Sequence, residues 1–468
     1  MSVISDILQC ITDKKEWYNK IYNNTIVDKW YHEIKKIQEK NIYDDFILSI
    51  NILKTSVQGS DLHLKNCKYK DIQICEECSE HTKDIIIDLI KDNKNTDYDI
   101  DNDEYWLEEY MNDNDLEAKD ICIHKLCNCV GPDSDLNKFI IYNHSLLSSE
   151  LRIKLNESIN NMMNNTSTDW HPGSNNQVRD IIHPSMYCYV KGESYITVDD
   201  KVEIEKCEDE TLKYQWLPSQ FLINEGKVKL KSYINNLDTN KFSEFVPLVE
   251  SVLGEFIDPF EKIIKQKLDK FQVIVKVAST HLNNNNQVFN GGSWHIEGMP
   301  YEHIIATGLH YVKVEGITDS FLEFRKPVII NEESLEYPQS DEKYTSYHYG
   351  LDGHYDGNMN KYLGLIKCDE GASVIFPNTL QHHVKSFNKL NNIDEGTRII
   401  MAFFLIDPNE KIISSADVLQ QQPEYNNTHT FTLEEATHHR DRLMYHRKYF
   451  VNKLNKKVYE RPYSLCEH

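Results

Sequence analysis

The chain has 468 residues, of which 40% are hydrophobic and 27% charged, so it is a globular protein long enough for two or three domains or for one large β domain with helical additions. Its formal net charge of -23 would repel a phosphate backbone, and no dense run of lysine and arginine overrides it, so we expect no nucleic-acid partner. No stretch reaches the roughly 18 apolar residues that cross a bilayer, and the first residues lack a signal-peptide pattern, so we expect a soluble cytoplasmic protein without a membrane partner.

The N-terminal third has the pattern of helices. Between Glu16 and Lys40, large apolar side chains recur at three- and four-residue steps, as in an amphipathic helix. The stretch from Lys91 to Glu104 is rich in Asp, Asn and Lys and is predicted to be an exposed loop. A further helix is predicted from Leu146 to Asn164. Together these features predict a mostly helical N-terminal region over residues 1–165.

A turn-rich segment follows from Asp169 to Asn236, where proline and glycine separate short stretches, and this texture predicts β-containing structure. A long helical pattern then runs from Phe242 to Lys270. We expect it to end or kink near Asp258-Pro259, because proline cannot continue the helical hydrogen bonds. Near the C-terminal end, Thr432-Leu433-Glu434-Glu435 is a capping-box pattern that predicts a polar helix to about Leu454.

Five strand-like segments lie between these two helical patterns. Many short strands without long helices between them indicate an antiparallel sandwich or a jelly roll. We therefore expect an α+β protein with a double-stranded β-helix (jelly-roll or cupin-like) core over residues 166–425 and a C-terminal helical extension over residues 426–468. The five segments are Gln272 to Thr280, Ile304 to Val314, Phe321 to Phe324, Ala372 to Pro377 and Arg398 to Ile406.

The clearest candidates for metal ligands are His295 and Glu297, two residues apart in a glycine-rich segment. At the end of a strand, residues two apart point the same way, so this imidazole and carboxylate can reach one ion. A third ligand must come from elsewhere, and the segment 376–384 supplies a histidine pair after a hydrophobic strand. Because adjacent strand residues face opposite sides, only one of His382 and His383 can point inward.

Two histidines and one carboxylate on one face of an octahedron are the arrangement of non-haem Fe(II) oxygenases, because three adjacent positions stay open for a chelating co-substrate and oxygen. A zinc hydrolase also keeps an open position, but it usually has a general base nearby, and nothing in the sequence specifies one. The competing imidazoles, which we interpret as structural or substrate-facing, are His303, His310, His348 and His354.

Arg398 leads an otherwise apolar strand. A buried arginine needs an anion, and its planar guanidinium binds a carboxylate through two parallel hydrogen bonds. This suits the far end of 2-oxoglutarate while the keto-acid end chelates iron. Oxidative decarboxylation would then generate a ferryl oxidant that abstracts hydrogen from the substrate. The alternative interpretation of Arg398 is a surface or interface residue.

Two thiol-rich clusters lie in the N-terminal third. Four of their side chains would suffice for a structural zinc site, but the spacing is not that of a standard zinc finger. Free buried cysteines are common, so reduced thiols are the main interpretation of the eleven cysteines and structural zinc the alternative. The clusters consist of His63, Cys67, Cys75, Cys78 and His81, and of Cys122, His124, Cys127 and Cys129.

Several short motifs occur in a fixed order along the chain. They are Asp169-Trp170-His171-Pro172-Gly173-Ser174, His183-Pro184-Ser185, Ser232-Tyr233-Ile234-Asn235-Asn236, Gly291-Gly292-Ser293-Trp294-His295-Ile296-Glu297-Gly298, Phe376-Pro377-Asn378 with Leu380-Gln381-His382, and Leu465-Cys466-Glu467-His468. In these motifs the chain resembles domain-of-unknown-function family 4246, a fungal-type family similar to Fe(II)/2-oxoglutarate-dependent oxygenases. The resemblance spans most of the chain.

This resemblance implies that His382, the histidine after Leu-Gln, is the distal metal ligand and that Arg398 anchors 2-oxoglutarate. Two positions depart from the commoner oxygenase pattern: Glu297 replaces an aspartate, and Ile400 stands where many relatives of the broader class have serine or threonine. The second departure leaves the remaining contacts of the co-substrate carboxylate open. The candidates for these contacts are Thr307 and Tyr311, on a strand expected beside that of Arg398.

The sequence thus predicts a non-haem Fe(II)- and 2-oxoglutarate-dependent dioxygenase that consumes O2, most simply a hydroxylase of a protein side chain, an amino acid or a small metabolite. Two other functions stay open. One is a jelly-roll binding module that keeps the pocket without turnover, and the other is a cupin-type metal-dependent hydrolase or isomerase, for which Arg398 would need another explanation.

Overall fold

The structure is a computed structural model that describes residues 3–57, 136–328 and 358–461, apart from residues 13, 15–16, 38–40, 137 and 426–427. Several sequence predictions therefore fall outside the described residues. They are the exposed loop at 91–104, both thiol-rich clusters, His348, His354 and the motif at 465–468.

The N-terminal helices pack on one another through buried isoleucine, phenylalanine and tryptophan side chains. The prediction of one helix from Glu16 to Lys40 is wrong, because the chain turns before Asn24 and starts a new helix there. Asn23 caps that helix, since its side chain accepts a hydrogen bond from the Ile26 backbone N–H at 3.3 Å. The helices are α1 (Val3–Thr12), α2 (Trp17–Lys20), α3 (Asn24–Lys35) and α4 (Tyr43–Val57).

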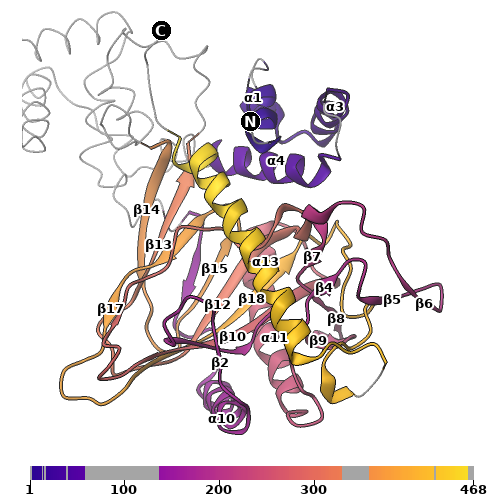
Figure 1. The fold of residues 1–468 in the computed structure, drawn as a ribbon. Coiled ribbons are helices and arrows are strands. Elements are labelled where there is room, and N and C mark those ends of the chain that lie inside the picture. Colours follow the sequence, from indigo (N-terminus) through magenta and orange to yellow (C-terminus); the bar gives the residue numbers. More distant parts are fainter. Residues whose placement is uncertain are drawn as a thin grey trace, which may run out of the picture.

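A nine-stranded antiparallel sheet forms the centre of the fold (Figure 1). Its neighbouring strands come from distant parts of the chain, so the sheet is held by long-range pairing. In order across the sheet, the strands are β1 (Ile141–Asn143), β15 (Ser373–Pro377), β12 (Ile304–Glu315), β18 (Gly396–Ile406), β10 (Lys270–Leu282), β3 (Val178–Ile182) and β2 (Asp169–Trp170), while β8 (Ser219–Asn224) pairs with β10 and β9 (Lys227–Leu230) pairs with β8.

A smaller sheet faces the inner side of the large one. Its order is β14 (Asn360–Lys367), β13 (Phe321–Pro327) and β16 (Gln381–Val384), and the short β11 (Val288–Phe289) and β17 (Phe387–Asn388) pair beside it. Side chains of both sheets form one buried apolar cluster, in which the rings of Phe324 and Phe376 meet edge to face at 5.0 Å. The two sheets therefore enclose an apolar interior.

Two helices cover the outer face of the large sheet: α10 (Ser149–Asn165) and α11 (Phe245–Ile264). The Phe256 ring of α11 packs on Phe403 of β18 at 5.3 Å, and a Cβ added at Gly308 of β12 would lie 2.6 Å from the same ring. Glycine at position 308 thus allows the helix to approach the sheet. The helix does not end near Pro259, because α11 continues through this buried proline, and the alternative of a kink there stays a prediction. Burial of this face of the helix offsets the lost hydrogen bond.

The C-terminal helix α13 (Leu433–Leu454) has the predicted capping box. Thr432 accepts a hydrogen bond from the Glu435 backbone N–H, and the Glu435 side chain accepts one from the Thr432 N–H. The π-helical turn η5 (Asn455–Tyr459) follows α13 directly and packs with the N-terminal helices. In Figure 1, α13 runs as a long yellow helix from the N-terminal helices along the sheets.

The remaining elements are short and lie between β3 and α11, before β12, or before α13. They are β4 (Tyr189–Val190) paired with β7 (Tyr214–Gln215), β5 (Tyr195–Val198) paired with β6 (Lys201–Ile204), and the 3₁₀ turns η1 (Glu210–Leu212), η2 (Pro300–Glu302) and η4 (Pro423–Tyr425).

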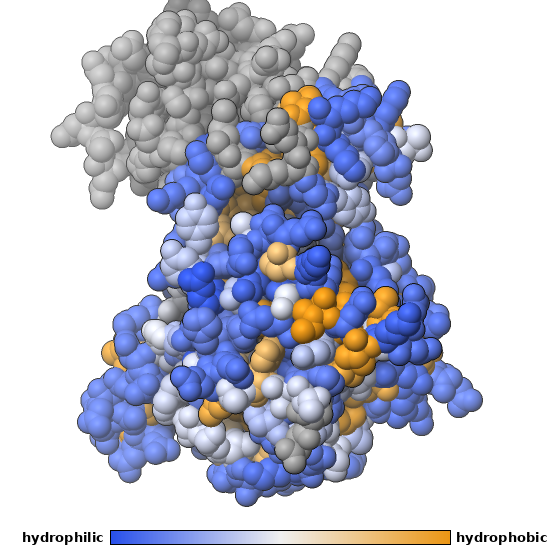
Figure 2. Space-filling model, turned by 45° about the vertical axis from the view of Figure 1, so that its right-hand side comes forward, coloured by the Kyte–Doolittle hydropathy of each residue, from blue (hydrophilic) through white to orange (hydrophobic). Residues whose placement is uncertain are grey.

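The expected mixture of helices with a large antiparallel sheet is confirmed, as are all five predicted strand segments. The proposed domain boundaries stay predictions. Among the described residues, no helix is both long and apolar enough to pass through a bilayer. Figure 2 shows a mainly hydrophilic face, on which hydrophobic residues gather most clearly to the right of its middle.

Candidate metal centre

The backbone pairs the two segments that carry the predicted ligands. His295 and His382 form an isolated antiparallel bridge, in which each backbone N–H donates to the other residue's carbonyl, at 3.2 and 3.1 Å. The two imidazole rings therefore lie side by side, with centroids 4.5 Å apart. Residues separated by 87 positions in sequence, 382 minus 295, are thus brought together by one rung of a ladder.

His295, Glu297 and His382 present one ligand atom each to a common point. The Glu297 Oε1 atom lies 3.6 Å from His295 Nε2 and 3.5 Å from His382 Nε2, and all the ligand atoms lie within 4.8 Å of one another. His382 is buried, whereas the other two side chains are half-buried. The cluster is therefore closed on the His382 side and accessible from the other.

The hydrogen bonding of His295 suits a metal ligand. Its Nδ1–H donates to the Ser293 carbonyl at 2.7 Å, which leaves the Nε2 lone pair directed at the cluster. A neutral imidazole with one nitrogen donating to a backbone carbonyl is the usual form of a metal-binding histidine.

The protonation states of Glu297 and His382 also favour a cation. Burial raises the pKa of the Glu297 carboxyl, but hydrogen bonds and charge from His295 and His382 outweigh it and hold that pKa well below its usual range. Burial and the neighbouring His295 lower the pKa of His382. Burial alone would lower the pKa of His295, but Glu297 raises it above the usual value. The Glu297 carboxylate is thus anionic, and the neighbouring His382 imidazole resists protonation.

Asn378, in the turn after β15, supports the Glu297 backbone. Its side-chain amide accepts a hydrogen bond from the Glu297 N–H and donates to the Glu297 and Ile304 carbonyls, all at 2.8–3.0 Å. In the sequence, Asn378 lies within the motif Phe376-Pro377-Asn378, which by itself indicates no role for this residue. An asparagine paired with a distant loop leaves no periodic signal, so only the fold identifies it.

Ile296, between the two ligands of the loop, points the opposite way and packs among the N-terminal helices. Beside it, a narrow cavity is lined by Ile47 and Leu48 of α4 together with Glu297 and Met299. The N-terminal helices thus hold the outer side of the metal-ligand loop. The alternation that lets His295 and Glu297 face one way predicts the opposite direction for Ile296, but not its packing partner.

The structure separates the two adjacent histidines of β16. The His383 ring stacks on Trp294 at 4.3 Å, nearly parallel, and its Nδ1 lies 3.3 Å from Glu323. His383 therefore faces away from the cluster that contains His382. The bridge to His295 sets this direction.

Arg398 is buried on the inner side of β18, and among the described residues no carboxylate forms an ion pair with it. Its guanidinium donates to the Ser320 hydroxyl at 2.9 Å and lies over the Phe387 ring at 5.0 Å, while its Nε–H is buried without a partner. A buried cation in this state is incompletely compensated. Arg398 is thus suited to bind an anion between the sheets.

Thr307 and Tyr311 lie on β12, directly beside the strand of Arg398, and their side chains face the interior between the sheets. The Thr307 hydroxyl is buried without a hydrogen-bond partner. Burial raises the pKa of Tyr311 far above its usual range, and the nearby Arg398 charge opposes this shift. The structure thus brings both candidates to the interior, with Tyr311 near the guanidinium.

The competing histidines that the structure describes lie outside the cluster. His303 forms an ion pair with Asp44 of α4 at 2.8 Å, and His310 hydrogen-bonds Ser373 at 2.9 Å under the outer helices. Their positions agree with structural roles.

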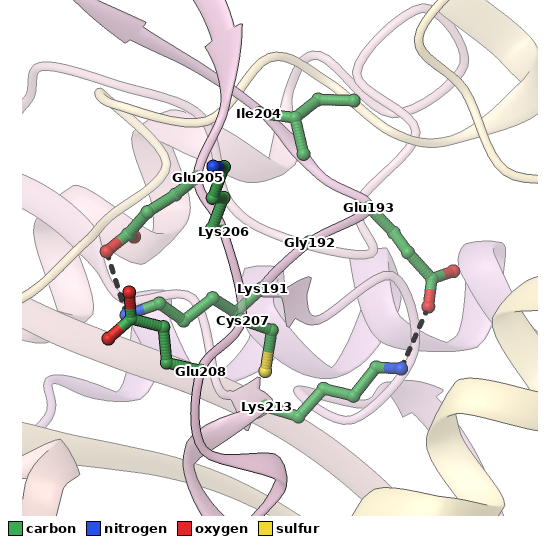
Figure 3. A pocket seen from close by; sticks show the side chains of 9 residues that line it. All are labelled: Lys191, Gly192, Glu193, Ile204, Glu205, Lys206, Cys207, Glu208 and Lys213. Carbon is green, nitrogen blue, oxygen red and sulfur yellow. Dashed lines mark ion pairs between the residues drawn. The ribbon is translucent and has the colours of Figure 1, made fainter.

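An open surface hollow lies in the region of the β5–β6 hairpin (Figure 3). It shares no residue with the metal-ligand cluster. Two ion pairs cross the hollow, Lys191 with Glu205 at 2.8 Å and Lys213 with Glu193 at 3.2 Å, while the other two charged lining residues, Lys206 and Glu208, form no ion pair among the described residues.

The fold and the site define an α+β protein with two facing antiparallel sheets and a two-histidine, one-carboxylate cluster at the rim of their interior. Residues 130–271 and 264–429 match the model of a family described as a protein of unknown function, DUF4246. The chain belongs to this family, which confirms the resemblance found in the sequence.

Several solved structures are similar to parts of the chain at low identity. A bsmA homologue from Methylobium petroleophilum PM1 is 7% identical over 60% of this chain and 93% of its own, with a TM-score of 0.29. IDO from Bacillus thuringiensis is 8% identical over 59% and 94%, at 0.30. A Trichoplax adhaerens prolyl hydroxylase, solved with a hypoxia inducible factor peptide, is 10% identical over 61% and 91%, at 0.26. At these TM-scores the likeness supports no conclusion. No curated protein sequence matched the chain.

Proposed function

We propose that this protein is an Fe(II)- and 2-oxoglutarate-dependent oxygenase, and specifically a hydroxylase. The observation that carries the proposal is the combination of the His295, Glu297 and His382 cluster with the uncompensated Arg398 guanidinium inside the same pair of sheets. A metal-ligand cluster alone would fit many enzymes. The added anion site is what a carboxylate-bearing co-substrate requires.

The order of the strands supports a double-stranded β-helix core. Along the chain from β10 to β18, strands of the large sheet (β10, β12, β15 and β18) alternate with strands outside it, where β11 pairs with β17 and β13 pairs with β14 and β16. This alternation supports the jelly-roll connection that we propose. Such a fold brings the rim of the small sheet and the inner side of the large one to a common interior.

The residues of the cluster fit an iron ion. Two imidazole nitrogens and one carboxylate oxygen are the donor set of the non-haem iron triad, and the half-exposed side of the cluster leaves room for further ligands. Ser293 orients the His295 ring, and Asn378 holds the backbone of Glu297. Both contacts keep the ligands in place before the metal binds.

The residues around Arg398 fit the far carboxylate of 2-oxoglutarate. Arg398 would bind it through its guanidinium, and the Tyr311 phenol is placed to supply a further hydrogen bond, whereas Thr307 pairs with Phe404, six residues along β18 from Arg398, and is too far away to contact the same carboxylate. The rings of Phe324, Phe376 and other buried aromatic residues exclude water from this interior. Bound iron and 2-oxoglutarate supply the oxidising power that inserts one oxygen atom of O2 into a C–H bond, with release of succinate and carbon dioxide. The substrate is a protein side chain, an amino acid or a small metabolite.

Anaerobic titration of the iron-loaded protein with 2-oxoglutarate tests the proposal. Chelation of the keto acid should give a weak visible charge-transfer band that saturates at one 2-oxoglutarate per chain. His295→Ala should remove both iron and band, while Lys276→Met, which leaves all three ligands in place, should keep the band. An iron-replete wild-type protein that shows no band at saturating 2-oxoglutarate would reject the proposal.

A further inference from the structure

A second cluster of metal-binding side chains lies outside the centre described above. His171 follows β2, Asp180 lies in β3 and His183 follows β3, so a β2–β3 hairpin brings all three together. Each offers one ligand atom, and these atoms lie within 4.8 Å of one another. Two of the motifs in the sequence, Asp169 to Ser174 and His183 to Ser185, thus meet at one place.

The geometry resembles that of the first cluster. The Asp180 Oδ2 atom lies 2.9 Å from His171 Nδ1 and 3.7 Å from His183 Nε2. The two imidazole rings are perpendicular, with centroids 5.1 Å apart, and one nitrogen of each ring lies near the Asp180 carboxylate, where a metal ion would replace the hydrogen-bonding proton. Ligands about 2.0–2.2 Å from a zinc ion lie roughly 3–3.6 Å from one another, which is close to the range seen here.

Burial makes the cluster unusual. The Asp180 and His183 side chains are almost fully buried, and Asp180 Oδ1 and His183 Nδ1 have no hydrogen-bond partner among the described residues. Buried polar atoms without partners cost free energy, so an ion that uses the open oxygen would lower this cost. The carboxylate is therefore only partly satisfied by the two histidines.

The cluster lies on the inner side of the large sheet. Asp180 is paired with Ala278 of β10, while the neighbouring pair Val277 and Ile182 belongs to the apolar layer under the outer helices. Lys276, two residues from Ala278, acts electrostatically on both His183 and His295. Its positive charge opposes a second cation, so its removal should strengthen metal binding at the second cluster.

We propose that His171, Asp180 and His183 form a second metal site, which takes a divalent transition-metal cation of the Zn²⁺ or Co²⁺ type. Two imidazoles and one carboxylate are the three-ligand set of open zinc sites, with the fourth position left to water or to another ligand. The ion would tie the turn after β2 to the end of β3 at the edge of the sheet. This site is independent of the oxygenase proposal.

Cobalt binding tests the site, because Co²⁺ replaces Zn²⁺ and absorbs visible light. The His295→Ala/His382→Ala double variant, after treatment with a chelator, lacks two ligands of the first cluster and keeps the second cluster intact. We expect it to bind one Co²⁺ per chain, and an added His183→Gln should abolish this binding. His310→Gln, which changes a buried histidine outside both clusters, should leave it unchanged. A folded double variant that binds no Co²⁺ would overturn the proposal.

A second comparison covers the case in which a buried substitution prevents folding. His171 is the more exposed of the two histidines, so His171→Gln in the otherwise unchanged protein should fold. The unchanged protein should bind one Co²⁺ ion per chain more than this variant, while Lys276→Met should bind that ion at least threefold more tightly. Equal stoichiometry in the unchanged protein and His171→Gln would show that the cluster is only a hydrogen-bonded trio.

Discussion

The side-chain amide of Asn378 pairs with both backbone polar groups of Glu297. Its Oδ1 accepts a hydrogen bond from the Glu297 N–H at 2.9 Å, and its Nδ2 donates to the Glu297 carbonyl at 2.8 Å. This two-point contact holds a ligand-bearing loop to the turn after a strand of the large sheet. The position of the Glu297 carboxylate thus depends on a residue that does not itself face the cluster.

We expect Asn378→Ala to weaken Fe(II) binding about 10–100-fold, which is the usual effect of removing a residue that orients a metal ligand. It should also lower the free energy of unfolding by about 1–3 kcal/mol, because buried backbone groups lose their partner. Metal titration and chemical denaturation measure the two effects. Asn378→Asp keeps the acceptor but loses the donor, so it should fall between Asn378→Ala and the unchanged protein. Unchanged iron affinity in Asn378→Ala would contradict this role.

His382 and His383 offer a matched pair of substitutions on one strand. We expect His382→Ala to lose Fe(II) binding, because its Nε2 faces Glu297. His383→Ala should keep it, since that ring stacks on Trp294 on the other side of the strand. Equilibrium dialysis with Fe(II) under argon would distinguish the two variants. Equal loss of Fe(II) binding in both variants would contradict the assignment of His382 as the specific ligand, because any substitution in this strand would then disrupt the site.

Arg398 and Arg447 are two buried arginines with opposite surroundings. Arg447 lies against both carboxylate oxygens of the buried Glu302, whereas Arg398 has no carboxylate partner among the described residues. We therefore expect Arg447→Met to cost about 3–5 kcal/mol of unfolding free energy, because it leaves a buried charge unpaired. Arg398→Met should change the unfolding free energy by less than about 1 kcal/mol, because no protein carboxylate loses its partner.

The same Arg398→Met variant should raise the half-saturating 2-oxoglutarate concentration at least tenfold in the anaerobic titration, since the loss of a charge-assisted pair weakens carboxylate binding. A large loss of stability without any change in 2-oxoglutarate binding would instead assign Arg398 a structural role. Denaturation and the charge-transfer band measure the two quantities separately.

His310 should make stability depend on pH. Burial, together with the Arg152 charge, lowers its pKa from 6.5 to about 4. Because the folded-state pKa lies below that of the unfolded chain, the unfolded state takes up the proton first as pH falls. The contribution of His310 is therefore complete above about pH 6.5 and is lost as the pH falls towards about 4.

We expect His310→Gln to remove this dependence. Between pH 7.5 and pH 4.5, the unfolding free energy of the unchanged protein should fall on the order of 2 kcal/mol more than that of the variant. Urea denaturation of both proteins across this range provides the measurement. Parallel pH profiles would show that the His310 pKa is close to its ordinary value in the folded protein.

Short-range patterns in the sequence determined much of this fold. Alternation and apolar runs are enough to predict β12 and β18, because a strand's side chains repeat every two residues. The capping box at Thr432 predicts the start of α13 from four residues alone. The His295 and Glu297 pair is equally local: alternation predicts that residues two apart face the same way, and the structure keeps this although only His295 lies in a β-bridge and Glu297 is in a loop.

Long-range packing decided the rest. Whether His382 or His383 faces Glu297 depends on the rung between His295 and His382, and whether α11 ends at Pro259 depends on what its apolar face covers. The same is true of the unpaired Arg398 and of the second cluster at Asp180, because the partners of a buried charge come from strands far away in sequence. Local periodicity carries no information about which distant strands become neighbours. The packing of those strands buries each of these groups, and this burial sets their chemistry.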